Sequence, residues 1–413
     1  MNVMPSSCSR SSSSKPRLVL HFDVNKTLLM ADAAEGKDLD QCLNNFLADT
    51  CFGRVVEEDG EQKRYRWEAV SDEPKVGPAP PGLLSYFHFV EKHATNKQQH
   101  KQMRDTFTHI GQPGRKYSSF LLRLKQKLLL KPQKEQEREE EEEEEEQRYH
   151  VIVPSFYRLL RHLKETERSF TLVFRTFGED LPKLQKEFNA FCEGQAGIYP
   201  GIDEYRITDE SKGCFFRNGP KSQDTHLILG TWEPVPDIQL GLQFYHEGDE
   251  KEDDEGRRKV LTGFRSVWEL TNDPSVKILA FRDYYRWWAM MGEKHWSGKP
   301  FVLHQNKKTQ KALLVEAETK RGEEGEETAV GDLVHHIFFD DNVWIPGYQE
   351  KGNNIVDIRD LETGETICPI ESLDVHIVRV EPMLAIQDEN YFITCLEKCE
   401  ENFALRSQER ETL

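Results

Sequence analysis

The chain has 413 residues, of which 31% are charged and 37% are hydrophobic, and its formal net charge is −18. This length suits one large domain with an insertion or two domains, and the acidity argues against general binding to nucleic acid. No run of about 18 apolar residues occurs, so we expect neither a membrane-spanning helix nor a membrane partner.

The N-terminal part of the chain changes character at Arg17. Residues 1–16 are rich in serine and contain no acidic residue, and we expect a disordered tail because they lack an amphipathic apolar face. Residues 17–22, RLVLHF, are mostly apolar and lead directly to Asp23. A short apolar run of this kind is typical of a parallel strand that is buried on both faces. The sequence therefore predicts Asp23 at the carboxyl end of a buried strand.

A long cap-type insertion is expected at residues 33–149. Residues 38–53 have a helical pattern, and residues 53–70 predict a hairpin that turns at Asp59-Gly60. Helical material follows, up to an acidic run at residues 134–147 that contains eight consecutive glutamates. We expect this run to be solvated and disordered, because like charges repel one another and cannot pack into a core.

Four further apolar runs resemble the first strand, and helical patterns lie between them. We expect all five runs to be strands of one sheet, since each is short and rich in valine, isoleucine, leucine and phenylalanine. The additional runs cover residues 169–175, 299–305, 333–339 and 353–360, and the helical patterns cover residues 153–167, 178–192 and 388–408. Strands that alternate with helices predict an α/β fold, a three-layer Rossmann-like parallel sheet with inserted cap segments.

A second insertion is expected at about residues 194–297, between the second and third runs. The α/β core would then consist of residues 17–32 and 150–413, and either this insertion or residues 33–149 could cover a ligand site. An aromatic run in the second insertion either lines a pocket or, more typically, packs a helix onto the sheet; it contains Tyr284, Tyr285, Trp287 and Trp288.

The eight cysteines include no C-x-x-C pair. Cys395 and Cys399 lie one helical turn apart, which is more typical of buried thiols than of metal ligands. We expect a cytoplasmic protein, because the reducing cytosol is the default compartment for scattered, unpaired cysteines.

Polar residues follow three of the predicted strands. Asp23 ends the first, Thr176 follows the second, and Asp340 with Asp341 follows residues 333–339. In open α/β sheets the ligand crevice lies outside the carboxyl ends of the strands, so these residues should converge. Carboxylates suit Mg²⁺, while hydroxyl and ammonium groups suit phosphate oxygens. Each residue alone is typical of a cap or turn, and only their joint placement predicts a magnesium and phosphate site.

Four short motifs carry a resemblance to a known family. They are HFDVNKTLL, LVFRTFG, GKP and IFFDDNV, in chain order. The chain resembles the haloacid dehalogenase-like hydrolase superfamily, most of whose members are Mg²⁺-dependent phosphatases. The resemblance covers residues 17–32, 150–190 and 295–360, and Thr27 falls where the first motif usually has threonine or valine.

The resemblance implies a role for each polar residue. Asp23 corresponds to the nucleophile that forms an aspartyl-phosphate. Thr176 corresponds to the hydroxyl that binds the transferring phosphoryl group. Lys299 corresponds to the lysine that steadies nucleophile and phosphate, and Lys294 is the alternative. The pair Asp340 and Asp341 corresponds to the acidic residues that hold Mg²⁺ together with Asp23.

Asn25 departs from the family pattern. Family phosphatases usually have an aspartate there, which protonates the leaving oxygen and then activates water. A carboxamide has no proton to exchange at neutral pH, and loss of a general acid/base typically costs ~10²–10⁴ in rate. The metal site is less affected, because the family's residue at this position offers its backbone carbonyl to the metal. Asn25 also suits a turn after the strand.

Three functions are therefore compatible with the sequence. The first is a slow or specialised phosphohydrolase that acts on a phosphorylated small molecule or a phosphoprotein. The second is a pseudoenzyme that binds such a ligand without turnover. The third is a different reaction on the same fold, because some relatives with another residue at the position of Asn25 are dehalogenases or phosphonate-cleaving enzymes.

Overall fold

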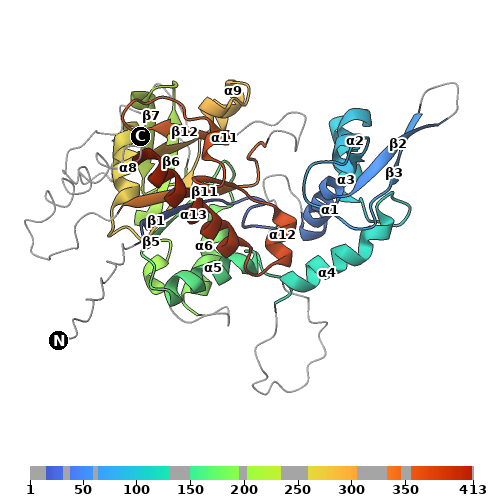
Figure 1. Ribbon diagram of the computed structural model, residues 1–413, viewed down its shortest axis with the longest axis horizontal. Coiled ribbons are helices and arrows are strands. Elements are labelled where there is room, and N and C mark those ends of the chain that lie inside the picture. Colours follow the sequence, from blue (N-terminus) through green and yellow to red (C-terminus); the bar gives the residue numbers. More distant parts are fainter. Residues whose placement is uncertain are drawn as a thin grey trace, which may run out of the picture.

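The computed structural model describes most of the chain and shows a mixed α/β protein (Figure 1). The described residues are 15–30, 38–58, 64–130, 149–194, 202–233, 259–304, 333–345 and 355–411. The acidic run at residues 134–147 and nearly all of the expected N-terminal tail lie outside them. None of the described helices is both long enough and apolar enough to cross a membrane.

A mostly parallel sheet of eight strands forms the centre of the molecule, in the order β13-β11-β1-β5-β9-β6-β7-β8. The neighbours from β13 to β6 are parallel, whereas β7 is antiparallel to both of its neighbours. The strands are β1 (Arg17–Asp23), β5 (Phe170–Thr176), β6 (Lys212–Arg217), β7 (Thr225–Leu229), β8 (Val260–Thr262), β9 (Ile278–Arg282), β11 (Val334–Asp340) and β13 (Ile377–Arg379). The predicted α/β class with a mainly parallel sheet is confirmed.

Helices flank this sheet, and the four helical patterns of the sequence all form helices. They correspond to α1 (Leu39–Thr50), α5 (Pro154–Glu165), α6 (Leu181–Cys192) and α13 (Tyr391–Glu411). The others are α2 (Tyr86–His93), α3 (Lys97–Asp105), α4 (Ser118–Leu128), α8 (Gly263–Asn272), α9 (Tyr285–Met290), α11 (Pro369–Ser372) and α12 (Pro382–Gln387). Local sequence explains their starts: Asp38 and Gln41 form a capping box at α1, and Pro154 occupies the first turn of α5.

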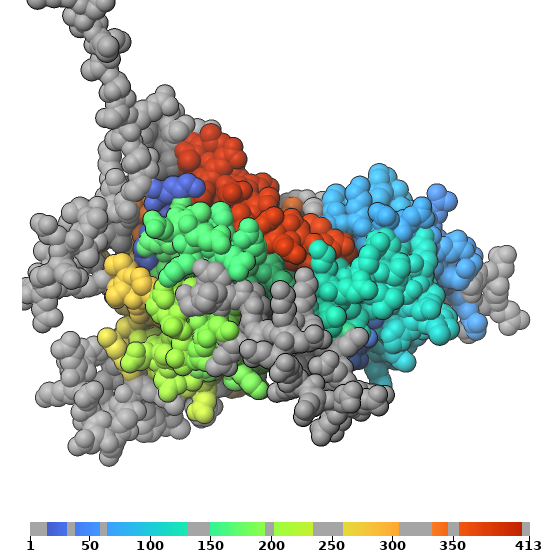
Figure 2. All heavy atoms as spheres, turned by 90° about the horizontal axis from the view of Figure 1, so that it is seen from below, coloured from blue at the N-terminus to red at the C-terminus, as the bar shows by residue number. Residues whose placement is uncertain are grey.

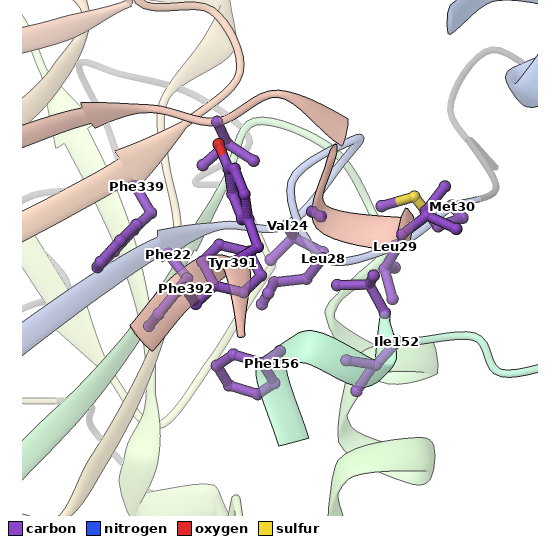
Figure 3. Close-up of a cluster of buried hydrophobic side chains, with 14 of the residues drawn as sticks. Phe22, Val24, Leu28, Leu29, Met30, Ile152, Phe156, Phe339, Tyr391 and Phe392 are labelled. Atoms are coloured by element: carbon purple, nitrogen blue, oxygen red, sulfur yellow. The ribbon is translucent and has the colours of Figure 1, made fainter. Parts of the chain in front are cut away.

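The first strand lies in the middle of the sheet and is buried along its whole length. It pairs with β11 on one side and β5 on the other. Phe22 packs against aromatic rings from both a strand and the helices, stacking on Phe339 at 4.5 Å between centroids and meeting Phe156 and Phe392 edge-on (Figure 3). Burial on both faces is the reason for the continuous apolar run before Asp23.

The predictions for residues 299–305 and 353–360 were wrong in one respect. These runs form β10 (Lys299–Leu303) and β12 (Val356–Asp360), but the two strands pair in a separate parallel sheet. This small sheet packs on a face of the main sheet, where Phe301 meets His21 of β1 and Phe338 of β11 edge-on. An apolar run reports burial on both faces and does not specify which strand will be its partner.

The described part of the insertion at residues 33–149 forms a lobe to one side of the rest of the molecule (Figure 2). Its strands are β2 (Phe52–Glu58), β3 (Arg64–Ala69) and β4 (Leu84–Ser85), and β2 pairs antiparallel with the other two. The predicted hairpin is thereby confirmed, although its turn at Asp59-Gly60 lies outside the described residues. Helix α12 of the core contacts α1 and α4 of this lobe.

The expected insertion at residues 194–297 does not stand apart from the sheet. Its described part contains β6, β7, β8 and β9, and β9 pairs directly with β5. The aromatic run after β9 packs against neighbouring rings: Tyr284 contacts Phe216 of β6 at 5.2 Å between centroids, and Trp288 of α9 stacks on Phe177 at 5.3 Å. Two of these strands do contain short apolar runs, Ile278–Phe281 in β9 and Leu227–Leu229 in β7.

Candidate functional site

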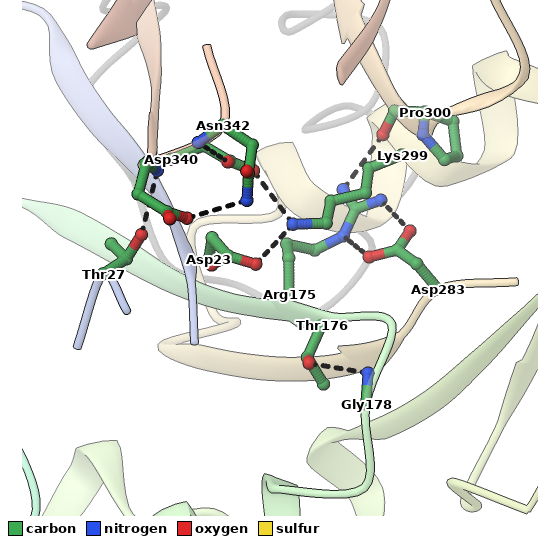
Figure 4. A network of polar contacts seen from close by, with 11 residues as sticks. Asp23, Thr27, Arg175, Thr176, Gly178, Asp283, Lys299, Pro300, Asp340 and Asn342 are labelled. Atoms are coloured by element: carbon green, nitrogen blue, oxygen red, sulfur yellow. Dashed lines mark hydrogen bonds and ion pairs between the residues drawn. The ribbon is translucent and has the colours of Figure 1, made fainter. Parts of the chain in front are cut away.

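Three charged side chains meet at the carboxyl edge of the main sheet. Asp23 ends β1, Asp340 ends β11, and Lys299 begins β10 of the small sheet. The ammonium group of Lys299 donates a hydrogen bond to Asp23 Oδ1 and another to Asp340 Oδ2, the latter at 2.9 Å (Figure 4). All three side chains are buried, and Lys299 is only 1% exposed. Lys299 is thus the lysine that reaches the carboxylates.

A third carboxylate joins this group. One carboxylate oxygen from each of Asp23, Asp340 and Asp341 lies within 4.8 Å of the other two. Hard oxygen donors at this spacing suit a divalent cation such as Mg²⁺, which prefers carboxylates and keeps several of its waters. Asp341 is half-buried, whereas Asp23 and Asp340 are buried.

Burial and neighbouring charges set the protonation of the site. Burial raises the pKa of Asp23 well above its usual value, and Lys299 opposes that shift. Burial and the neighbouring Asp340 raise the pKa of Asp341 to about 7. Burial also disfavours the charge of Lys299, but Asp23 and Asp340 outweigh it and raise the pKa of the lysine. Lys299 therefore stays charged, and a cation near the carboxylates favours their ionised forms.

Short hydrogen bonds fix the acidic pair. The backbone amide of Asn342 donates to Asp340 Oδ1 at 2.8 Å, and its side-chain amide donates to Asp341 Oδ1 at 2.9 Å. The backbone amide of Asp341 donates to Thr27 Oγ1 at 3.1 Å, which ties the end of β11 to the loop after β1. Thr27 thus connects the loop after β1 to the end of β11. The sequence showed only that Thr27 belongs to the first motif and did not predict this contact.

Thr176 and Asn25 meet around Gly178. The backbone amide of Gly178 donates to Thr176 Oγ1 at 2.9 Å. A Cβ on Gly178 would lie 3.0 Å from Asn25 Nδ2, 3.4 Å from Thr176 Oγ1 and 2.6 Å from Asp180 Oδ2, so only glycine leaves room for all three. The predicted site residues Thr176 and Asn25 are therefore neighbours, and Asp180 is a buried neighbour that the sequence did not reveal.

Asp180 has an unexpected orientation. It occupies the N-cap position of α6, where an aspartate side chain usually accepts hydrogen bonds from the first helical amides. Here the side chain makes no such capping bond and faces Gly178 instead. In the sequence, Asp180 resembles an ordinary helix cap after the second motif. Its position beside Asn25 was therefore not predicted.

A buried ion pair lies next to the site. Arg175, the residue of β5 directly before Thr176, donates hydrogen bonds to both carboxylate oxygens of Asp283, at 3.0 and 2.5 Å. Its guanidinium lies 4.7 Å from the ring centroid of Phe215. A charged residue inside a strand that is buried on both faces requires a partner, and this rule is the signal that could have revealed Arg175.

The aromatic side chain of Phe177 closes one side of the site. The ammonium group of Lys299 lies 5.5 Å from the centroid of this ring, within the range of a cation–π contact. Trp288 stacks on Phe177, and Tyr285 contacts both of these rings. Phe177 therefore connects Lys299 to the aromatic run after β9.

Comparisons with known proteins give no further assignment. The chain matches no protein-family model, and neither the curated proteins nor the solved structures include a significant match.

Proposed function

We propose that this protein is a Mg²⁺-dependent phosphohydrolase with the three-layer Rossmann-like fold of the haloacid dehalogenase-like superfamily. The observation that carries the proposal is the convergence of Asp23, Asp340 and Asp341 on one point with Lys299 bound between two of them. These residues belong to the first, third and fourth motifs, which lie far apart in the sequence. The substrate would be a phosphorylated small molecule or a phosphoprotein.

Asp23 is the nucleophile of the proposed reaction. A carboxylate oxygen of Asp23 attacks phosphorus, the bond from phosphorus to the leaving oxygen breaks, and an aspartyl-phosphate forms. Water then attacks the same phosphorus, which releases phosphate and restores the carboxylate. Lys299 and the hydroxyl of Thr176 stabilise the negative phosphoryl oxygens. Mg²⁺, held by the three aspartates and the backbone carbonyl of Asn25, would neutralise further negative charge on the phosphoryl group.

Asn25 narrows the range of substrates. Its amide offers no exchangeable acid proton to the leaving oxygen, so departure of an alkoxide should be slow by roughly 10²–10⁴. Aryl and acyl phosphates leave without protonation and should be hydrolysed more readily. The buried Asn25 Oδ1 accepts no hydrogen bond among the described residues, so it can accept one from water or from a ligand hydroxyl.

The same residue favours a second candidate, a pseudoenzyme that binds a phosphorylated ligand without turnover. In that case Asp23, Lys299 and the acidic pair would hold the phosphate and the metal, and no aspartyl-phosphate would accumulate. The architecture around Asn25 is intact, because Gly178 and Thr176 remain packed against it.

A steady-state assay with Mg²⁺ tests both candidates. The substrates are an aryl phosphate and an alkyl phosphate, and the variants are Asp23→Asn and Asn25→Asp. Aryl phosphate hydrolysis that is lost in Asp23→Asn supports the phosphohydrolase. Hydrolysis that appears only in Asn25→Asp supports the pseudoenzyme. No hydrolysis by any folded variant that still binds Mg²⁺ would contradict the hydrolase proposal.

A further inference from the structure

Two buried arginines of the main sheet hold the backbone on either side of Lys299. Arg217, at the end of β6, donates from Nη1 to the carbonyl oxygen of Gly298 at 3.0 Å. Arg175, on β5, donates from Nη1 to the carbonyl oxygen of Pro300 at 2.9 Å (Figure 4). Both arginine side chains are 1% exposed. The residues before and after the site lysine are thus each fixed by a charged donor from another sheet.

Each arginine is itself held in place by a buried carboxylate. Arg175 forms a two-point contact with Asp283, which directly follows β9. Arg217 pairs with Asp357 of β12 at 2.9 Å, and Asp357 also accepts from Arg359 at 2.7 Å. In Arg175 the other two nitrogens bind Asp283, so this planar and rigid guanidinium cannot rotate away from the carbonyl of Pro300. In Arg217 the same Nη1 that donates to Gly298 also lies 2.9 Å from Asp357.

The peptide before Lys299 is held from the opposite side as well. The backbone amide of Lys299 donates to the carbonyl oxygen of Ile355 at 2.7 Å. A Cβ on Gly298 would lie only 2.0 Å from that oxygen, so glycine is needed for this approach. Together with the fixed φ of Pro300, these contacts determine the direction in which the Lys299 side chain leaves the backbone.

Fastening the small sheet to the main sheet is a simpler role for these ion pairs. Apolar side chains already join the two sheets, with Phe301 packed against His21 and Phe338. Buried ion pairs add little to stability compared with such packing, because removing the charges from water costs about as much as their attraction returns. Fastening therefore does not explain why charged donors select the two carbonyls that flank the site lysine.

We propose that Arg175 and Arg217 are positioning residues, which hold Lys299 so that its ammonium group lies between Asp23 and Asp340. Their effect on turnover rests on the proposed phosphohydrolase function, but their effect on the placement of Lys299 does not. A side chain that reaches its target over four methylene groups magnifies any rotation of its backbone. Misplacement by about 1 Å can cost roughly 10²-fold in rate.

The test uses two variants that leave each buried carboxylate with a cation, and one matched control. Arg217→Met leaves Asp357 paired with Arg359, and Arg175→Lys keeps a cation opposite Asp283 while removing the fork that also reaches Pro300. The control is Arg17→Lys. Arg17 is also a buried arginine of the main sheet, and it donates to Thr171 Oγ1 and to the carbonyl oxygen of Asn272, away from the site lysine.

The first readout is the rate of aryl phosphate hydrolysis with Lys299 present and with Lys299→Ala. Arg217→Met and Arg175→Lys should each lower kcat by about 10- to 100-fold when Lys299 is present, and by less than about 3-fold in the Lys299→Ala background. Arg17→Lys should show no such dependence on Lys299. Equal losses in both backgrounds would mean that the arginines act only on the fold, and would overturn the proposal.

The second readout does not require turnover. An amine-reactive acylating reagent with mass-spectrometric detection should leave Lys299 unmodified in the native protein and in Arg17→Lys, and should modify it in the other two variants. If the native protein hydrolyses nothing but labelling changes as expected, the phosphohydrolase function fails and the positioning role stands. If Lys299 stays protected in both variants, the positioning role is wrong, whatever the activity.

Discussion

Two adjacent layers of buried side chains lie between the main sheet and the small sheet, and they differ in charge. At the carboxyl edge lie Asp23, Asp340 and Lys299, whereas two residues earlier on β1 and β11 lie His21 and Phe338, stacked at 5.5 Å between centroids. Burial raises the pKa of Asp23 and lowers the pKa of His21, so it opposes charge in both layers. Buried side chains stay charged only beside an opposite charge. The two layers therefore differ in charge because their neighbouring groups differ, although both layers are buried.

Among the changes that test this comparison, removal of Lys299 should have the largest effect on the free energy of unfolding. Lys299→Met leaves Asp23 and Asp340 buried without a cation, which should lower the free energy of unfolding by about 3–5 kcal/mol at pH 7. The loss should shrink as the pH falls, because Asp23, whose folded pKa is raised by burial, becomes protonated and loses its unfavourable charge. Urea unfolding at pH 7.5 and pH 5 measures both effects, and an equal loss at both pH values would contradict this account. Lys299→Met with Asp340→Asn should recover part of the stability.

Magnesium offers a way to strengthen the charged layer. Mg²⁺ at 100 times its Kd should stabilise the native protein by about 2.7 kcal/mol, because it binds only the folded site. The double change Asp340→Asn with Asp341→Asn should abolish the rise in Tm. Calorimetry with and without Mg²⁺, at matched ionic strength, checks the result. A shift that survives in the double variant would place the metal elsewhere.

The uncharged layer that contains His21 should make the protein less stable at acid pH. Burial lowers the folded pKa of His21 well below its usual value of 6.5 and lowers that of His336 to about 3, so below pH 6.5 protons bind the unfolded chain preferentially. Stability is therefore lost as the pH falls, by about 2 kcal/mol per histidine at pH 5.

The variant His21→Phe should reduce that loss. Neither ring nitrogen of His21 has a hydrogen-bond partner in the described part of the chain, so phenylalanine removes no bond and fits beside Phe301 and Phe338. The difference in unfolding free energy between pH 7 and pH 5 should fall by about 2 kcal/mol. An unchanged difference would mean that His21 takes up its proton in the folded state.

The smallest effect is expected from a change in the acidic run. Deleting Glu139–Glu146 should change the free energy of unfolding by less than about 0.5 kcal/mol, because a run of like charges cannot contribute to a packed core. The Lys299 and His21 effects should be the same in the shortened chain. A large loss of thermal stability would show that the run pairs with basic residues of the protein.

Sequence revealed one part of the site more readily than the other. Asp23 and Asp340 each end an apolar run, and because parallel strands end at one edge, their proximity could be predicted. Lys299 was harder, since its strand has the same apolar composition as the main-sheet strands although it belongs to another sheet. Composition encodes burial, and pairing depends on the whole fold.

The supporting residues were hidden for a different reason. Arg175 stands in a strand that otherwise looks apolar, and its partner Asp283 lies 108 residues later in the chain. Asp180 has the appearance of an ordinary helix cap, but its side chain faces Gly178. Contacts between distant residues leave no periodic pattern, so local reading of the sequence could not pair them. The three-residue strand β13 is likewise too short to give such a pattern.

The position of β1 between β5 and β11 has a consequence for folding during synthesis of the chain. One partner of β1, the strand β5, is synthesised early. The other partner, β11, can pair with β1 only after Val334–Asp340 has been synthesised. The hydrogen bond between Thr27 and Asp341 likewise joins residues that are 314 positions apart. At about 5–20 residues per second, ribosomal synthesis of that stretch takes roughly 15–60 s. During this time one edge of β1, a strand that is buried along its whole length in the native protein, lacks its native neighbour. Newly made chains should therefore depend on chaperones until β11 has left the ribosome.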